Sequence, residues 1–313
     1  MKIDFDCAVS LLRENNNFII LTHANPDGDT LGGGFALLAA LRALGKKARV
    51  DCGETVPEKY RFLTLLGDDV QSGFVVSVDV ADVKLLNDSV REKYADKIDL
   101  AIDHHSTNRL FAEKTYLEGN SASVCEVVFL LIKALGVKID EEIATRLYTG
   151  CSTDTGCFRY SNVTPRTHRI AAELIECGAR HADVNVRMFE TKKPGFLKLQ
   201  SLCLSGMELH FSGKVSVLSV TRKMLSECSC GDEDCDAIVA LSRQIEGVLA
   251  GVTFKEKADG TLKVSLRTHE GVDAAAVCSA FGGGGHVRAA GCQFECSLEK
   301  AKRQVLEELK KYI

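Results

Sequence analysis

Short apolar runs alternate with helical stretches through the first 190 residues, and this alternation restricts the fold more than any other feature of the sequence. The apolar runs at 18–21, 74–78 and 98–102 have the length of buried strands. The stretches at 31–44, 121–135 and 140–147 repeat apolar residues with the period of a helix. Strands separated by helices predict an α/β domain with a parallel sheet and helices on both faces.

Acidic and histidine residues follow these apolar elements, at the ends where a parallel sheet collects its functional groups. They lie in four segments: HANPDGD at 23–29, Asp79 after the second run, Asp-His-His at 103–105 after the third, and Asp154 in TDTG. Each segment taken singly has an ordinary interpretation, because DGD is typical of a turn and an aspartate at a strand end is typical of a helix cap.

Taken together, the four segments indicate a site for metal ions. Carboxylates gathered at one edge of a sheet repel one another unless cations lie between them. Mixed imidazole and carboxylate ligands suit manganese, zinc or iron, and carboxylates also suit magnesium. About seven possible ligands exceed what one ion needs, so two ions that share a bridging carboxylate are expected. Such a pair can share a water molecule and lower its pKa toward neutrality, which supplies hydroxide without a separate strong base.

The sequence changes character at 191–195, where lysine, proline and glycine together indicate a linker. Beyond it, one β-hairpin is predicted at 207–211 and 215–220, and another at 248–255 and 262–267. Helices are expected at about 234–244, 273–281 and 298–312. We therefore expect a catalytic domain at 1–190, a linker at 191–200 and a smaller mixed α/β domain at 201–313, with a cleft between the two domains.

Charge and cysteine usage narrow the functional class. The formal net charge is −4, whereas proteins that grip long nucleic acids usually carry a basic excess. The sequence contains no apolar run of the roughly 18 residues that a membrane span needs, and its acidic start does not fit a secretory signal, so a cytoplasmic protein is expected. The cysteines are expected to be reduced and to pack as small hydrophobes. For Cys228-x-Cys230-x4-Cys235, an exposed loop is preferred over a zinc site, which would need paired CxxC spacing.

The order of these motifs resembles the DHH phosphoesterases, a family that includes RecJ-type exonucleases, family II pyrophosphatases, polyphosphatases and nanoRNases. The shared pattern is HxxxDxD at 23–29, the strand-end Asp79, the Asp-His-His triplet and the later Asp154. After the linker, the segment FGGGGHVRAAG at 281–291 is similar to the glycine-rich signature of the C-terminal domain associated with this family. Ser106 departs from the commoner pattern, in which proline follows the triplet, but this position supplies no ligand.

The resemblance implies in-line hydrolysis of a phosphoester without a covalent enzyme intermediate, and it implies a role for each matched residue. A first divalent ion would be held by His23, Asp27 and Asp79, and a second by Asp29, Asp79, His104 and Asp154, with Asp79 bridging. The ions would be Mn²⁺, with Mg²⁺ or Co²⁺ as alternatives. The catalytic residues would be Asp79, Asp103, which orients a metal-bound histidine, and His105, which faces the substrate phosphate. Substrate binding is expected from the following residues: Arg159, Arg267, Gly283, Gly284, Gly285, His286 and Arg288.

The glycine run has two interpretations. The glycines either permit a tight turn for steric reasons or form a nest of backbone N–H groups that binds an anion. His286 and Arg288 follow the run directly and favour anion binding.

Within the family, the resemblance is closest to nanoRNases, which degrade oligonucleotides of two to five nucleotides and often remove the 3′-phosphate of 3′-phosphoadenosine 5′-phosphate (pAp). A soluble phosphodiesterase for cyclic dinucleotides, or for linear pApA and pGpG, is the alternative. A RecJ-type nuclease would be larger and more basic, and an inactive nucleotide-binding relative would have lost a metal ligand. We expect short nucleotides as substrates, no binding of long nucleic acid or membranes, and a monomer or homodimer.

Overall fold

A computed structural model describes residues 1–313, with the exception of the side chain of Asp236. The chain divides into two compact units, Met1–Thr191 and Lys192–Ile313. The division falls within the segment 191–195, where lysine, proline and glycine occur together.

The first unit is built on a parallel sheet, as the sequence predicts. Its spatial order is β1 (Lys2–Ile3), β6 (Lys114–Leu117), β5 (Leu100–Asp103), β4 (Phe74–Val78), β2 (Phe18–Leu21) and β3 (Ala48–Asp51). The neighbouring strands pair in parallel throughout this order. The neighbours β5, β4 and β2 correspond to the three predicted apolar runs. Since parallel strands end at the same edge, the residues that follow these three strands lie next to one another.

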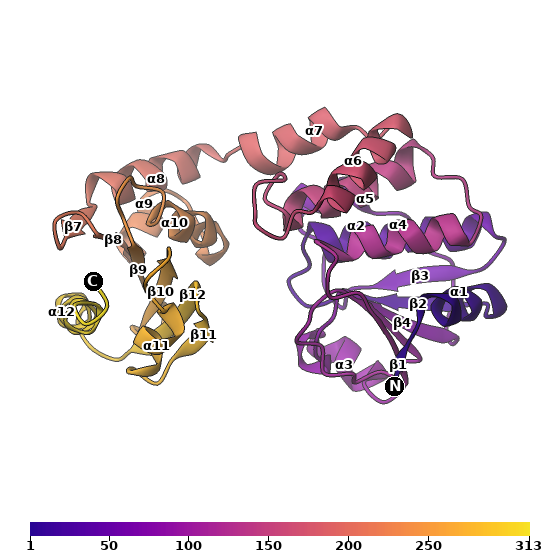
Figure 1. The fold of residues 1–313 in the computed structure, drawn as a ribbon, viewed down its shortest axis with the longest axis horizontal. Coiled ribbons are helices and arrows are strands. Elements are labelled where there is room, and N and C mark those ends of the chain that lie inside the picture. The colour runs from indigo at the N-terminus through magenta and orange to yellow at the C-terminus, as the bar shows by residue number, and fades with distance from the viewer. The chain divides into compact units, whose positions relative to one another are not determined.

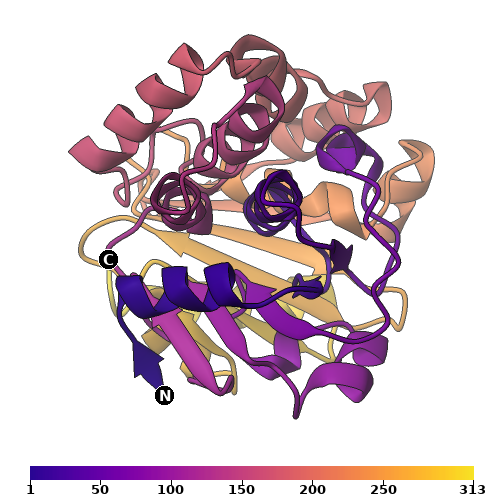
Figure 2. The same ribbon diagram turned by 90° about the vertical axis from the view of Figure 1, so that its right-hand side faces the viewer.

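Helices cover both faces of this sheet (Figure 1). The helices α1 (Phe5–Glu14), α2 (Gly28–Ala43) and α4 (Val124–Ala134) cover one face, and α5 (Glu141–Asp154) packs on α2. The opposite face is covered by α3 (Asp88–Tyr94). Figure 2 shows α1 in indigo close to the strands and to the N-terminus. Successive residues of β2 point to opposite faces, and both sets are buried, as expected for a sheet covered on both sides.

Shorter helices complete the first unit. They are η1 (Glu58–Leu63), η2 (Val83–Leu85), α6 (Pro165–Glu176), α7 (His181–Asn185) and η3 (Val186–Glu190). Among them, α6 and α7 pack against α5.

The start of α2 is determined by the predicted acidic turn. The side chain of Asp27 caps the helix, accepting hydrogen bonds at Oδ1 from the backbone N–H groups of Asp29 (2.9 Å) and Thr30 (3.2 Å). Glycine lets α2 approach α5 closely, because a Cβ on Gly32 would lie 2.5 Å from the carbonyl oxygen of Arg146. The first turn of α2 is therefore held beside α5.

The second unit contains a mixed sheet. Its spatial order is β11 (Gly284–His286), β12 (Ala289–Phe294), β10 (Leu262–Thr268), β9 (Ala250–Glu256), β8 (Val215–Val220) and β7 (Glu208–His210). The pair β8–β9 is parallel and the other pairs are antiparallel. The two predicted hairpins, β7–β8 and β9–β10, are confirmed.

Helices also cover both faces of the second sheet. One face carries α11 (Ala274–Ser279) and α12 (Leu298–Leu309), and the other carries α8 (Pro194–Ser205), α9 (Arg222–Glu227), η4 (Asp232–Asp234) and α10 (Cys235–Leu241). The helix predicted at about 234–244 is α10, which is shorter and spans Cys235–Leu241. The side chain of Asp236, within this helix, lies outside the described residues. Residues 194–200 of the expected linker form the start of α8, in which Phe196, Leu199 and Cys203 are buried in a cluster with Leu218 of β8.

Two further expectations concern membranes and cysteines. Within the described residues, the helices are too short or too polar to cross a membrane. Cysteines such as Cys125, Cys151, Cys278 and Cys292 are buried in the apolar cores. Cys228 and Cys235, which the sequence analysis placed in an exposed loop, are also buried, packed with Cys203 in the cluster beneath α8. This correction has a simple cause, since the thiols complete an apolar core that α8 and α9 share with the sheet.

Candidate metal centre

The predicted acidic and histidine residues converge at the edge where β2, β4 and β5 end. His23 follows β2, Asp79 follows β4, and His104 follows β5. Asp29 lies on the first turn of α2, and Asp154 is the last residue of α5. The close packing of α2 on α5 thus adds two carboxylates to the residues that the strands supply.

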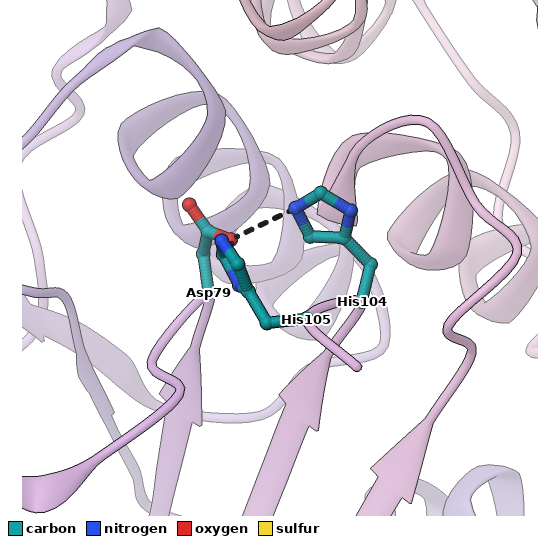
Figure 3. A group of neighbouring side chains, drawn as sticks. All are labelled: Asp79, His104 and His105. Atoms are coloured by element: carbon teal, nitrogen blue, oxygen red, sulfur yellow. Dashed lines mark ion pairs between the residues drawn. The ribbon is translucent and has the colours of Figure 1, made fainter. Parts of the chain in front are cut away.

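Asp79 lies at the centre of this edge. Its backbone has a positive φ of 64°, in the left-handed region that few residues other than glycine adopt but that aspartate tolerates better than most. The Asp79 N–H donates to the carbonyl of Ile102 (3.0 Å) and so ties the turn to β5. Its carboxylate lies close to the rings of both His104 and His105, and Figure 3 marks the ion pair with His104.

Ligand atoms gather around Asp79 in overlapping groups. The groups His23–Asp27–Asp79, Asp29–His104–Asp154 and Asp79–His104–His105 each have ligand atoms within 4.8 Å of one another. The Nε2 atom of His104 lies 3.4 Å from Asp79 Oδ1, 3.7 Å from Asp29 Oδ2 and 3.8 Å from Asp154 Oδ2. The Nε2 atom of His23 lies 3.7 Å from both Asp27 Oδ1 and Asp79 Oδ2. The Nε2 atoms of His23 and His104 thus belong to two separate groups of possible metal ligands, each with carboxylate oxygens close to an imidazole nitrogen.

The spacing of these atoms fits metal coordination better than hydrogen bonding. Around an ion with bonds of about 2.0–2.2 Å, ligand atoms lie about 3–3.5 Å apart. The distances here, 3.4–3.8 Å, approach that range and exceed normal hydrogen-bond lengths. Among the described residues, Asp79 Oδ1 and His104 Nε2 are buried without a hydrogen-bond partner. Buried polar atoms require partners, and a cation would satisfy both of these.

The pKa shifts also indicate that the clustered carboxylates lack enough positive charge to balance them. Burial disfavours a protonated His23, but its two carboxylate neighbours outweigh burial and raise its pKa to about 11. For His104, Asp79 and Asp29 likewise outweigh burial and raise the pKa to about 10. Burial, reinforced by Asp79, raises the pKa of Asp29 well above its usual value. The site therefore attracts protons in the absence of metal, and divalent ions would neutralise the same carboxylates.

Asp103 is completely buried, and it orients His105. Its Oδ1 accepts hydrogen bonds from His105 Nδ1 (2.8 Å) and from the backbone N–H of His104 (2.8 Å). This hydrogen bond to Asp103 raises the pKa of His105. We expected Asp103 to orient a metal-bound histidine, but the ring of His104 donates instead to the carbonyl of Ser121 (3.1 Å). The reason is geometric, since the Asp103 side chain reaches the second histidine of the triplet.

The structure gives a steric reason for the glycine run in the second unit. A Cβ on Gly283 would collide with the carbonyl of Gly291, and Gly285 has a φ of 146°. The N–H groups of Gly282 and Gly283 donate to the carbonyls of Ser279 and Cys278. These two groups are thus used within the turn, so the anion-nest interpretation does not hold for them, whereas exposed Gly284 and Gly285 pair with β12.

The predicted substrate-binding arginines donate hydrogen bonds to backbone carbonyls. Arg267 is on β10 and donates to the carbonyl of Leu266 (3.0 Å). Arg288 follows β11 and donates to the carbonyl of His269, and His286 is exposed on β11. In the first unit, Arg159 donates to the carbonyl of Gly156 (2.6 Å) in the turn after α5.

Several residues at the centre were not identified from the sequence. Asn108 donates to Asp103 Oδ2 (2.6 Å) and to the carbonyl of Val80 (3.1 Å). The backbone N–H groups of Val124 and Cys125 donate to Asp29 Oδ2 (2.6 Å) and Oδ1 (3.0 Å). A loop asparagine and backbone N–H groups carry no pattern by which sequence alone distinguishes them. Ser123, as an N-cap residue, was the available signal that a helix begins beside the site.

Comparisons with known proteins agree with this architecture. The family model described as "DHH family, N-terminal domain" matches residues 17–151, and the DHHA1 domain model matches residues 219–313. A relative from Thermus thermophilus, named bifunctional oligoribonuclease and PAP phosphatase NrnA, is 35% identical over 302 residues. That alignment covers 93% of this chain and 88% of the relative.

Solved structures are similar in fold. An exopolyphosphatase-related protein from Bacteroides fragilis matches with a TM-score of 0.88 and 24% identity, covering 98% of this chain and 95% of that one. A RecJ exonuclease from Thermus thermophilus, solved in complex with Mn²⁺, matches with a TM-score of 0.54 and 15% identity. This second match covers 98% of this chain and 54% of the RecJ chain.

Proposed function

Because the chain belongs to the DHH family of phosphoesterases, we propose that it uses divalent metal ions to hydrolyse short oligonucleotides to mononucleotides and pAp to AMP. The similarity to the oligoribonuclease and PAP phosphatase extends over both units, which supports transfer of this substrate class. The observation that carries the proposal is the convergence of carboxylates and imidazoles around Asp79.

We assign the ligands to two ions. His23, Asp27 and Asp79 would hold the first, and Asp29, Asp79, His104 and Asp154 the second. The overlap of the ligand groups at Asp79 supports a bridging role for this residue. Divalent ions bound there would supply Lewis acidity toward phosphoryl oxygens and lower the pKa of water. Mn²⁺ is our first choice of ion because the donors are mixed imidazole and carboxylate.

His105 is suited to act on the substrate. Its ring is 44% exposed, and its Nδ1–H is engaged by the buried Asp103. Asp103 therefore orients the ring and stabilises its protonated form, which leaves Nε2 available as a donor. A protonated Nε2 would donate a hydrogen bond to a phosphoryl oxygen or a proton to the leaving oxygen.

The second unit would bind the substrate. We propose that Arg267, His286 and Arg288 contribute positive charge and hydrogen-bond donors for a nucleotide phosphate or sugar. The exposed Gly284 and Gly285, which lack side chains, would leave the backbone of β11 accessible to that group. A recognition site of this size suits a substrate end rather than a long strand, in agreement with the net charge of −4.

A substrate panel tests the proposal. Release of mononucleotides would be measured from a labelled dimer, pentamer and 24-mer, and release of phosphate from pAp, each with Mn²⁺ and with a chelator. We expect hydrolysis of the dimer and of pAp, slower hydrolysis of the 24-mer, and loss of all activity with chelator. Equal rates on the dimer and the 24-mer would contradict the short-substrate assignment. Preferential cleavage of cyclic-di-AMP, included in the panel, would favour the cyclic-dinucleotide alternative.

A further inference from the structure

The segment 121–125, which leads from β6 into the first turn of α4, lies outside the four motifs. It contacts two proposed ligands of the second ion directly and a third through Asn162. The carbonyl of Ser121 accepts the hydrogen bond from His104 Nδ1 (3.1 Å). The N–H groups at 124 and 125 donate to both oxygens of Asp29. Asn162 Nδ2 donates to the carbonyls of Ala122 (3.0 Å) and Asp154 (3.3 Å). A displacement of this one segment would therefore move these ligands together.

The ligands specific to the first ion depend on other contacts. His23 forms an isolated β-bridge with Leu86, and the N–H of Ala24 donates to the carbonyl of Leu85 (2.7 Å). The Asp27 side chain is held by the hydrogen bonds through which it caps the N-terminus of α2. The two proposed ion sites share Asp79 and are linked by the hydrogen bond from the Asp29 N–H to Asp27 Oδ1, but their other supports come from different parts of the fold.

An arginine and a buried glutamate hold the segment in place. Arg166, at the start of α6, donates from Nη2 to Ser121 Oγ (2.6 Å), and its Nε lies 3.4 Å from Glu126 Oε2. The Glu126 side chain is fully buried, and its backbone N–H donates to Ser123 Oγ (3.3 Å). A buried carboxylate is costly unless it is paired, so this interaction constrains both α6 and the start of α4.

We propose that Arg166, Glu126 and Asn162 are positioning residues, which hold Asp29, His104 and Asp154 in the arrangement that the second divalent ion requires. The proposal rests on the metal-dependent function proposed above. Its chemistry follows from the hydrogen bond to Ser121, which places the proton of His104 on Nδ1 and leaves Nε2 for the ion. Outer-shell contacts of this kind determine metal affinity through ligand orientation.

Titration of the metal-free protein with Mn²⁺ by calorimetry tests this assignment. The variants are Arg166→Lys, which keeps a positive charge near Glu126 but loses the forked geometry, and Asn162→Ala, which truncates an exposed side chain. Arg180→Ala is the control, because Arg180 pairs with Glu141 and Glu142 on the far end of α5. We expect two binding events in the wild type and the control. In both test variants, one of the two events should lose about 10- to 100-fold in affinity, with the other event unchanged.

Steady-state kinetics provide an independent readout. With the same Mn²⁺ concentration, kcat of both variants should fall while KM stays close to the wild-type value, and excess Mn²⁺ should restore part of kcat. Thermal unfolding without metal establishes that each variant is folded, and if Arg166→Lys does not fold, Asn162→Ala decides the question.

Two results would overturn the inference: wild-type affinity for both ions in the folded variants, or equal weakening of both events. Failure of the proposed function would look different, because the wild type itself would then bind no Mn²⁺ and hydrolyse no substrate.

Discussion

At the scale of single residues, the chemistry depends most on Asp79. Its carboxylate is 4% exposed, lies near His23, His104 and His105, and belongs to two of the three possible ligand groups. Burial opposes its ionised form, but the surrounding histidines outweigh burial and lower its pKa below the usual range. A permanently charged carboxylate at this position is what two neighbouring cations would share.

Replacing Asp79 with asparagine should therefore abolish turnover. Asp79→Asn keeps the size of the side chain but removes its charge, and we expect activity below about 1% of wild type, since even outer-shell substitutions cost 10- to 100-fold. Hydrolysis of a labelled dinucleotide with Mn²⁺ measures the effect. The control is Asp82→Asn, because Asp82 caps η2 and asparagine also caps helices. Wild-type activity of Asp79→Asn would refute the bridging role.

Metal binding should also depend on pH. In the metal-free protein, the pKa of His23 is about 11 and that of His104 about 10, so both rings carry a proton at neutral pH. Ligation requires the neutral imidazole, so binding must release protons, and a higher pH must strengthen it. We expect Mn²⁺ affinity to rise steadily between pH 6 and 8. Calorimetry in buffers of different ionisation enthalpy counts the released protons, and a count of zero would contradict this account.

At the scale of elements, the close packing of α2 on α5 brings Asp29 and Asp154 to the strand ends. Gly32 and Gly34 lie on the same helix and allow a matched comparison. A Cβ on Gly32 would lie 2.5 Å from the Arg146 carbonyl, whereas a Cβ on Gly34 would make an ordinary contact of 3.5 Å with Thr22.

Gly32→Ala should therefore destabilise the protein by about 1–3 kcal/mol, because the helices must separate. Gly34→Ala should be neutral or stabilise it by up to about 1 kcal/mol through helix propensity. Urea unfolding of both variants measures the difference, and equal stabilities would show that the α2–α5 distance is not restricted by Gly32.

Many of the helices and strands could be predicted from the sequence, for reasons specific to each element. The strands β2, β4 and β5 were predicted because their apolar runs are short and are followed by polar or acidic residues. Proline and glycine at 194–195 fit both a linker and a first helical turn, so the sequence left the exact start of α8 undetermined. The histidine ring that Asp103 bonds, that of His105, could not be predicted, since adjacent residues in a triplet cannot be told apart by spacing.

At the scale of the whole molecule, the two units should make separable contributions. The first unit holds the proposed metal ligands, and the second holds Arg267, His286 and Arg288. Substitutions in the second unit should then affect substrate capture without changing metal binding.

Arg267→Ala is expected to raise KM for pAp by about tenfold or more, as loss of a charge-assisted hydrogen bond costs about 1.5–3 kcal/mol. Mn²⁺ affinity should not change. Lys263→Ala is the matched control, because Lys263 is an exposed cation on the same strand, β10. An unchanged KM in Arg267→Ala, measured by initial rates, would remove this residue from the substrate site.

The sequence by itself determined the fold class, the family and the set of acidic and histidine residues, because strand and helix periodicity and motif order are local properties of the chain. Only the tertiary structure decided which atoms meet: that Asp103 bonds to His105, that the start of α4 binds Asp29, and that Arg166 secures Ser121. These contacts join residues as far apart as 95 positions, and local patterns cannot encode such distances. They depend instead on how the helices pack against a common sheet edge.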